Sequence, residues 1–191
     1  MAALLAAACL AQGASHGVPA IVVVAARAQI GKTVLYDGSY RRLAYPGGDV
    51  PLERGVCTDV LVRAFRAAGA DLQALVHEDM KAAFDRYPTA WGLTAPDANI
   101  DHRRVPNLVV FFSRHARVLR ADDDPSHYAP GDVVVWRLAS GVPHIGLVSD
   151  ALAPGTGRPL VIHNIGRGVQ EEDVLFAYVL THHFRYIPPG R

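Results

Sequence analysis

Residues 54–65 read RGVCTDVLVRAF and place a lone cysteine where a helical pattern begins. Over residues 57–68 apolar side chains recur at steps of three and four, which predicts a helix with one buried face. Gly69 follows directly, as is typical of a helix C-terminus. The first turn of a helix carries backbone N–H groups without intrahelical partners, and these stabilise a thiolate. The stretch therefore predicts either a reactive thiol at Cys57, with a pKa lowered to roughly 3.5–7.5, or a small buried core residue.

Helical patterns also flank this segment. Residues 18–34 are rich in Ala, Val and Ile and predict a first helix. Residues 72–87 predict another, which Asp71 can cap and Pro88 stops. Residues 105–116 predict a further helix with a strongly apolar side. The remaining segments between them are rich in Gly, Pro and polar residues and are expected to be loops, namely residues 36–51, 88–103 and 121–131.

The pattern changes in the last third of the chain. Residues 132–138 and 144–148 are β-branched and aromatic, and the turn sequence between them predicts a hairpin. Residues 159–163 and 177–187 predict two more strands, whereas residues 171–176 suggest one helical turn. Helices followed by strands indicate an α+β fold, with N-terminal helices packed on a C-terminal antiparallel sheet.

The length, hydrophobic fraction and charge of the chain indicate which classes of protein it can belong to. The chain has 191 residues, of which 50% are hydrophobic and 19% charged, as expected for one globular domain, assigned to residues 18–191. Nineteen Lys and Arg residues against 18 Asp and Glu residues leave a net charge of +1 without a basic run. These values argue against a nucleic-acid partner. No later apolar run is long enough for stable membrane insertion, and the oligomeric state is left open.

The first residues predict export to the periplasm or the extracellular space. Residues 1–17 combine a short apolar run with small and polar residues, as in a signal peptide. The basic start of such a peptide is missing, which a truncated start or a wrongly chosen start would explain. A frayed Ala-rich helix is the alternative. Once the leader is removed, Cys57 is the remaining cysteine and cannot form an internal disulfide.

Two histidines are candidates for a base and its orienting group. A thiol nucleophile needs a base, and the base needs a third group that orients it. His144 opens one predicted strand, and His163 and Asn164 end the next. Neighbouring strands lie about 4.8 Å apart, so opposed side chains can touch. The chain thus predicts that His144 and His163 meet if these two strands pair.

The order of these residues resembles the papain-like cysteine hydrolases, in particular the NlpC-type cell-wall peptidases. Their histidine strand is matched by His144-Ile145-Gly146-Leu147-Val148, and their second polar position by Ile162-His163. The chain departs from them at Val56 and Thr58, where these enzymes usually have aspartate and serine. From residue 36 to 186 it also resembles a family of uncharacterised exported bacterial proteins, through the segments YPGGDVP, GVCTDV, DLQ-LVHEDM, IDHRRVPNL, PGDVV-W, PHIGLVSD and HNIG.

This resemblance implies an exported cysteine hydrolase that cleaves an amide bond, most plausibly in peptidoglycan peptides, without a cofactor. Cys57 would be the nucleophile, His144 the general base and later acid, and His163 the group that orients His144, with Asn164 as its substitute. Three alternatives stay open: a non-catalytic cell-envelope binding module, a cysteine acyltransferase or thioesterase, and a zinc site formed by the cysteine and the two histidines.

Several polar residues outside this set are candidates for substrate binding. Arginine forms forked bonds with carboxylates, and peptidoglycan stem peptides carry free carboxylates. Helix capping, surface ion pairs and simple turns are the competing interpretations. The candidates are Tyr45, Asp49, Asp59, Asp101, His102, Arg103 and Arg104.

Overall fold

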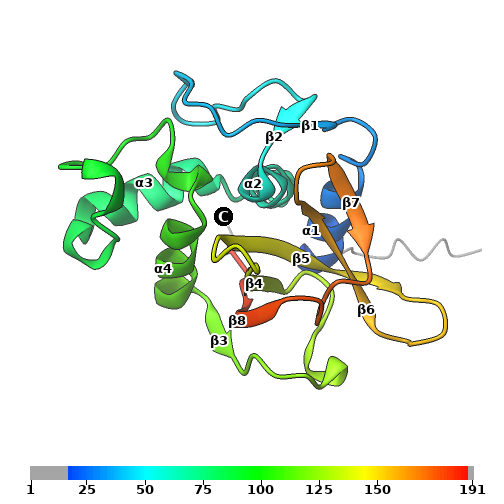
Figure 1. Ribbon diagram of the computed structural model, residues 1–191. Helices are drawn as coiled ribbons and strands as arrows, with labels where there is room; N and C mark the ends of the chain where they lie inside the picture. Colours follow the sequence, from blue (N-terminus) through cyan, green and yellow to red (C-terminus); the bar gives the residue numbers. More distant parts are fainter. Residues whose placement is uncertain (1–16, 189–191) are drawn as a thin grey trace, which may run out of the picture.

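The computed structural model describes residues 17–188, with most helices preceding the sheet (Figure 1). The predicted leader, residues 1–17, lies outside this range except for Gly17. The described helices are α1 (Val18–Arg27), α2 (Cys57–Ala67), α3 (Leu72–Ala82) and α4 (Val105–His115), with 3₁₀ turns at Phe84–Arg86, Ala90–Gly92, Asp101–Arg103 and Pro125–His127. Among the described residues, no helix combines the length and the apolar character needed to cross a membrane.

A six-stranded antiparallel sheet forms the second layer, in the order β3-β8-β4-β5-β6-β7. The last strand in the chain, β8, lies between β3 and β4. A separate pair of two-residue parallel strands, β1 and β2, precedes α2. The bounds are β1 Leu35–Tyr36, β2 Arg54–Gly55, β3 Arg117–Leu119, β4 Val133–Arg137, β5 Pro143–Leu152, β6 Pro159–Asn164, β7 Val169–Glu172 and β8 Val179–Arg185.

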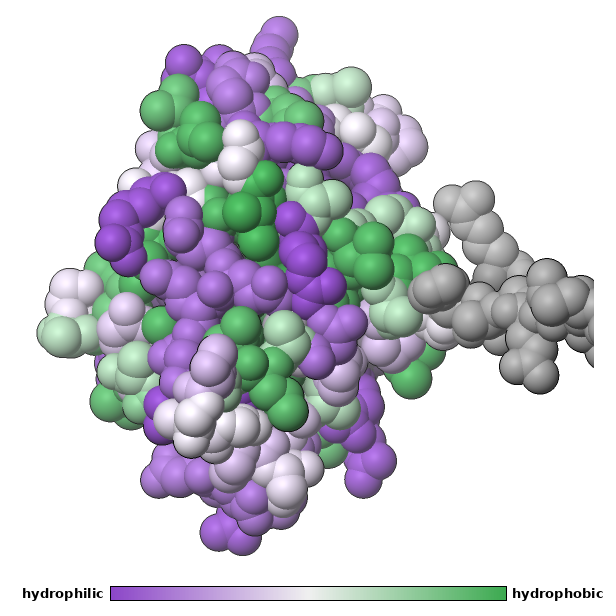
Figure 2. All heavy atoms as spheres, turned by 90° about the vertical axis from the view of Figure 1, so that its right-hand side faces the viewer, coloured by the Kyte–Doolittle hydropathy of each residue, from purple (hydrophilic) through white to green (hydrophobic). Residues whose placement is uncertain are grey.

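The helices cover one face of the sheet, and alternation along each strand separates two apolar clusters. On β4, Val133 and Val135 belong to the larger cluster with the helices, whereas Val134 and Trp136 belong to a smaller cluster on the opposite face. The indole N–H of Trp136 donates to the carbonyl of Leu175 at 2.9 Å, which satisfies this buried donor. On the surface shown in Figure 2, hydrophilic side chains separate several small hydrophobic patches.

The predicted α+β class is confirmed, and so is the helix that begins at Cys57. Two helix ends were predicted too late. The first helix ends at Arg27, and the turns after it include Gly31 with a φ of +72°, which is incompatible with a continuing right-handed helix. The helix predicted over residues 72–87 ends at Ala82.

Two features of the sheet differ from the prediction. The helical turn predicted over residues 171–176 is wrong at its start, because this part of the chain belongs to β7 and pairs in register with β6. Cross-strand pairing overrides local propensity here. The strand β3 was not predicted, since three residues are too few to show a two-residue period.

Candidate active site

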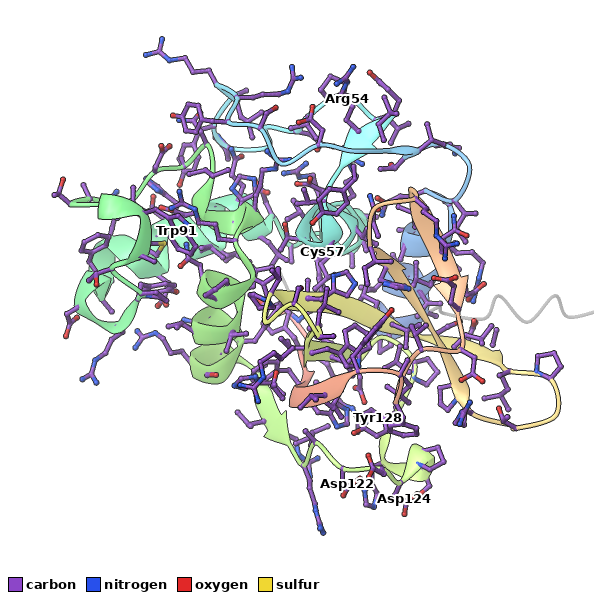
Figure 3. The ribbon with its side chains drawn as sticks, viewed as in Figure 1. Arg54, Cys57, Trp91, Asp122, Asp124 and Tyr128 are labelled. Carbon is purple, nitrogen blue, oxygen red and sulfur yellow. The ribbon has the colours of Figure 1, made fainter. Side chains whose placement is uncertain are left out.

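Cys57 is placed by the first turn of α2. The residue before it, Val56, has an extended backbone, and its N–H donates to the carboxylate of Asp59 at 2.7 Å, as in a capping box. Asn164, at the end of β6, donates from Nδ2 to the carbonyl of Gly55 at 3.1 Å. The helix start is therefore tied to the sheet, and Figure 3 shows Cys57 where α2 meets β5.

The sulfur of Cys57 is buried among hydrogen-bond donors. The residue is 4% exposed, and the backbone N–H groups of Ile145 and Thr58 and the hydroxyl of Tyr36 act on its thiol by lowering the pKa. Burial raises the pKa of the thiol to about 11, because desolvation of the thiolate outweighs these donors. The expectation of a lowered pKa is therefore wrong: the helix start supplies N–H groups, but the site excludes water.

β5 and β6 are not paired at Ile145, which leaves the backbone of β5 accessible to the sulfur of Cys57. The pairing of β5 with β6 covers Leu147 with Ile162 and Val148 with Val161, and does not extend to Ile145. On its other side Ile145 is paired with β4. The N–H that the sulfur meets thus belongs to the residue directly after His144, at the end of the sheet where β5 and β6 separate.

The two predicted histidines are in contact. Nε2 of His144 lies 2.8 Å from Nδ1 of His163, which confirms that their strands bring them together. The other ring nitrogen of His163, Nε2, donates to the carboxylate of Glu172 on β7 at 3.1 Å. The indole of Trp136 stacks on His144, with ring centroids 5.6 Å apart and planes inclined by 20°. Each imidazole is therefore fixed by a neighbouring strand.

Burial keeps both imidazoles neutral at pH 7. The pKa of His144 is lowered to about 3, first by burial and second by the nearby His163. Burial also lowers the pKa of His163, while the carboxylate of Glu172 acts in the opposite direction. The free site thus holds a neutral thiol and two neutral imidazoles.

Gly146 permits the close approach of the two histidine strands. A Cβ atom at this position would lie 2.8 Å from Cγ1 of Val161 and 3.2 Å from Cβ of His163. Any larger residue would push β6 away from β5. The glycine between the two buried strand residues Ile145 and Leu147 therefore helps to set the contact between the histidines.

Asn164 does not take the place of His163. Its Nδ2 group donates to Gly55, and its Oδ1 accepts from the N–H of Gly166 at 3.1 Å. Both ends of the amide are thus engaged with backbone, and it is His163 that contacts His144. Asn164 holds the segment before Cys57 against the sheet.

Two of the predicted substrate-binding residues form a buried ion pair. The guanidinium of Arg103 donates to both carboxylate oxygens of Asp59, at 2.9 and 3.0 Å, and the two side chains are only 1% and 4% exposed. Arg103 also donates to the carbonyls of Asp37 and Ser39. These contacts support the start of α2 and the loop after β1, and leave neither charge free for a substrate carboxylate.

The other residues of the 101–104 segment also face protein partners. Asp101 is 1% exposed and accepts from the N–H of Asp97. Arg104 lies 3.4 Å from Asp101, and its guanidinium carbon lies 4.2 Å from the ring centre of Trp91. His102 is 2% exposed, and its Nδ1 has no hydrogen-bond partner among the described residues.

Tyr45 and Asp49 are outside the cysteine–histidine group. The hydroxyl of Tyr45 donates to Glu78 at 2.8 Å, and Asp49 forms an ion pair with Arg63 at 2.8 Å. Both interactions hold the Gly-rich loop against α2 and α3. A role for these two residues in substrate binding stays a prediction.

The buried imidazole of His102 makes folding sensitive to acid. Its pKa is lowered to about 4, mainly by burial, so the unfolded chain binds a proton that the folded chain rejects. Stability should therefore fall as the pH drops from about 6.5 to about 4, by up to about 3 kcal/mol from this group. Urea unfolding of wild type and His102→Gln across this range should show a smaller loss in the variant. Equal losses would contradict this account.

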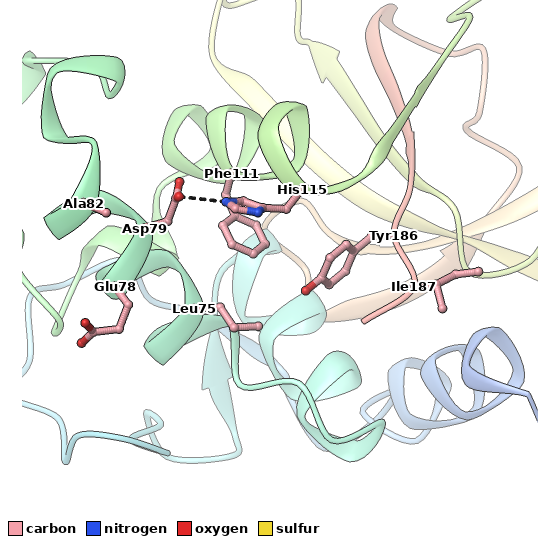
Figure 4. Close-up of a pocket in the computed structure, with 8 residues that line it drawn as sticks. All are labelled: Leu75, Glu78, Asp79, Ala82, Phe111, His115, Tyr186 and Ile187. Carbon is pink, nitrogen blue, oxygen red and sulfur yellow. Dashed lines mark ion pairs between the residues drawn. The ribbon is translucent and has the colours of Figure 1, made fainter. Parts of the chain in front are cut away.

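A separate hollow lies between α3, α4 and the end of β8 (Figure 4), with a volume of about 570 Å³. Inside it, Nε2 of His115 lies 2.8 Å from Asp79. Burial raises the pKa of Asp79, but hydrogen bonds from Arg114, Tyr87 and His115 outweigh it and lower the pKa to about 2. This carboxylate is thus engaged with protein groups, and none of the predicted site residues lines the hollow.

Three features of the site were not anticipated from the sequence. They are the hydroxyl of Tyr36 over the sulfur, the N–H of Ile145 beside it, and the carboxylate of Glu172 behind His163. Tyr36 and Glu172 lie in segments interpreted as a loop and a helical turn, so no strand register connected them to the site. Within residues 17–188, no three His, Cys, Asp or Glu side chains are grouped so as to hold a metal ion.

Comparison with known proteins places the chain in a family. Residues 23–186 match the domain of unknown function DUF1287. The chain is also similar to the uncharacterized protein YijF of Escherichia coli (strain K12), with 58% identity over 161 residues, covering 84% of this chain and 78% of that protein. The match extends across α2 and all strands of the sheet. The chain therefore belongs to the DUF1287 family.

Proposed function

We propose that this protein is a papain-like cysteine hydrolase that cleaves an amide bond, with Cys57 as nucleophile, His144 as base and His163 as the group that orients His144. The observation that carries the proposal is the arrangement at the end of β5. The sulfur at the start of a helix meets the N–H of Ile145, and the adjacent His144 is held at 2.8 Å by His163. The resemblance to NlpC-type peptidases supports peptidoglycan peptides as the substrate and an exported location for the protein.

The proposed reaction proceeds by acyl transfer. The thiol proton passes to His144 as the sulfur attacks the amide carbonyl, so the C–S bond forms while the carbonyl electron pair moves to oxygen. Backbone N–H groups in the first turn of α2 stabilise this oxyanion. The C–N bond then breaks, and His144 protonates the leaving amine. Water, deprotonated by His144, cleaves the thioester and releases a carboxylic acid and the free thiol.

The high pKa of the thiol determines when the proton leaves the sulfur in the proposed mechanism. Because Cys57 and His144 are both neutral in the free protein, proton transfer accompanies attack and does not precede it. The hydroxyl of Tyr36 lowers the pKa of the thiol, so it is close to the sulfur and must move aside for a substrate. Tyr36 belongs to a two-residue strand and is 48% exposed, although burial of its hydroxyl raises the pKa of the phenol to about 12.

A second candidate function follows from the same burial. A cysteine that is 4% exposed and has a raised pKa is also what a non-catalytic binding module would retain in its core. In that case the protein binds cell-envelope fragments without converting them. The two functions differ in turnover, so a product assay separates them.

The test is digestion of muropeptides by the full chain, followed by mass spectrometry. Wild type should give fragments whose summed mass exceeds that of the substrate by one water, and Cys57→Ala should give none while its thermal unfolding stays similar to wild type. Ester and thioester substrates form a second arm, in which Cys57-dependent products would indicate an esterase or thioesterase. Binding of muropeptides without any Cys57-dependent product would overturn the hydrolase proposal and support the binding module.

A further inference from the structure

We infer that Glu172 is a positioning residue of the site, which selects the tautomers of His163 and His144 and so leaves Nδ1 of His144 as the base. The role of Nδ1 as a base rests on the proposed function. The tautomers of the two histidines do not, and they can be measured without any activity. Glu172 lies on β7, two strands away from His144, and touches neither His144 nor the sulfur in any contact of the described residues.

His144, His163 and Glu172 form a row of two hydrogen bonds, and the carboxylate of Glu172 determines which nitrogen donates in each. An ionised carboxylate only accepts, so Nε2 of His163 must carry the proton that it shares with Glu172 at 3.1 Å. A neutral imidazole has one N–H, and Nδ1 of His163 is therefore an acceptor. The group 2.8 Å away, Nε2 of His144, must then be the donor.

The same reasoning determines the free nitrogen of His144. With its proton on Nε2, the neutral ring carries a lone pair on Nδ1. A base must accept a proton at the nitrogen that faces the nucleophile, and Nε2 is already occupied by His163. Nδ1 is thus the nitrogen of His144 that remains to take the proton of Cys57 during attack.

Without the carboxylate, the two rings can carry their protons on the opposite nitrogens without losing the hydrogen bond between them. His163 can place its proton on Nδ1 and donate it to Nε2 of His144, which forces the proton of His144 onto Nδ1. The hydrogen bond between the rings is kept, but the base is lost. A carboxylate that orients an imidazole is valuable for this reason, because it excludes the inactive tautomer.

The carboxylate of Glu172 lies between the buried His163 and the partly exposed Arg167. Its side chain is 29% exposed, and its second oxygen lies 3.4 Å from the guanidinium of Arg167, which is 76% exposed. The neighbouring Glu171 is engaged elsewhere, with Arg27 and Ser149. Glu172 therefore retains contact with water and with a cation while its other oxygen faces the buried histidine.

The experiment is ¹⁵N NMR of the histidine side chains in the full chain at pH 7, without any ligand. In wild type, His144 and His163 should both show the Nε2–H form. Glu172→Met removes the acceptor at similar length, and a substantial Nδ1–H population should appear in both rings. Glu172→Gln, which keeps an acceptor oxygen, should restore the wild-type form in part. Glu171→Met is the matched control on the same strand and should leave both rings unchanged.

The kinetic arm uses the Cys57-dependent muropeptide cleavage. Glu172→Met should lower kcat by about 10- to 100-fold with little change in KM, and Glu172→Gln should recover part of the loss. Wild-type tautomers in Glu172→Met would overturn the inference and leave the hydrolase proposal standing. A tautomer change in a protein whose wild type has no Cys57-dependent activity would support the inference and contradict the proposed function.

Discussion

Replacing His144 with alanine should lower the rate of Cys57-dependent cleavage by about 10³-fold. The thiol has a pKa near 11, so at neutral pH it does not supply a thiolate by itself and depends on a base. General-base catalysis contributes about 10²- to 10⁴-fold, and the proposed mechanism uses it in every turnover. The measurement is kcat for muropeptide cleavage at pH 7, with substrate saturating so that a change in binding does not enter.

The pH profile of the same variant provides a second readout. Without the imidazole, the remaining activity should increase with pH toward 11, because only ionised thiol then attacks. His182→Ala is the control, since His182 lies on β8 of the same sheet, contacts Thr181 and Phe184, and is outside the chain of bonded histidines. A His144→Ala variant with wild-type kcat would exclude His144 as the base.

Replacing Arg103 with methionine should cost about 3–5 kcal/mol of the free energy of unfolding. The change leaves the carboxylate of Asp59 buried without its cation, and a lone buried charge is far more costly than the pair. It also removes the donors to the carbonyls of Asp37 and Ser39. Urea unfolding at pH 7 measures the loss, and near-ultraviolet circular dichroism shows whether the folded state persists.

Two further variants separate ion pairing from general damage. Arg54→Met removes a guanidinium that is 38% exposed and bonded to Asp37, and should cost no more than about 1 kcal/mol. Adding Asp59→Leu to Arg103→Met removes the unpaired charge and should recover part of the stability, though not the cap on Val56. If Arg103→Met lowered the free energy of unfolding as little as Arg54→Met, the buried pair of Arg103 and Asp59 would not contribute to stability as described.

The helix at Cys57 and the meeting of the two histidines could be predicted because both follow from local pattern. The apolar period after Cys57 and the β-branched runs around His144 and His163 are strong signals, and strand pairing then brings the histidines together. Glu172 could not be found in this way. Its strand is recognisable only through its register with β6, which depends on the tertiary fold.

Of the two interpretations of Cys57, the thiol with a lowered pKa was wrong for a related reason. Sequence shows that Cys57 begins a helix, and a helix start stabilises a thiolate. It does not show that Tyr36, 21 positions earlier in the chain, covers the sulfur. Likewise, Arg103 and Asp59 look like free charges in the sequence, and only packing reveals that they neutralise each other.

The position of β8 in the sheet has a consequence for the timing of assembly. This strand comes last in the chain, yet it lies between β3 and β4, and β4 is the partner of the strand that bears His144. A growing polypeptide therefore presents the cysteine more than a hundred residues before the support beneath the histidine is complete. The sheet beside His144 therefore cannot reach its full strand order until residues 179–185 have been synthesised.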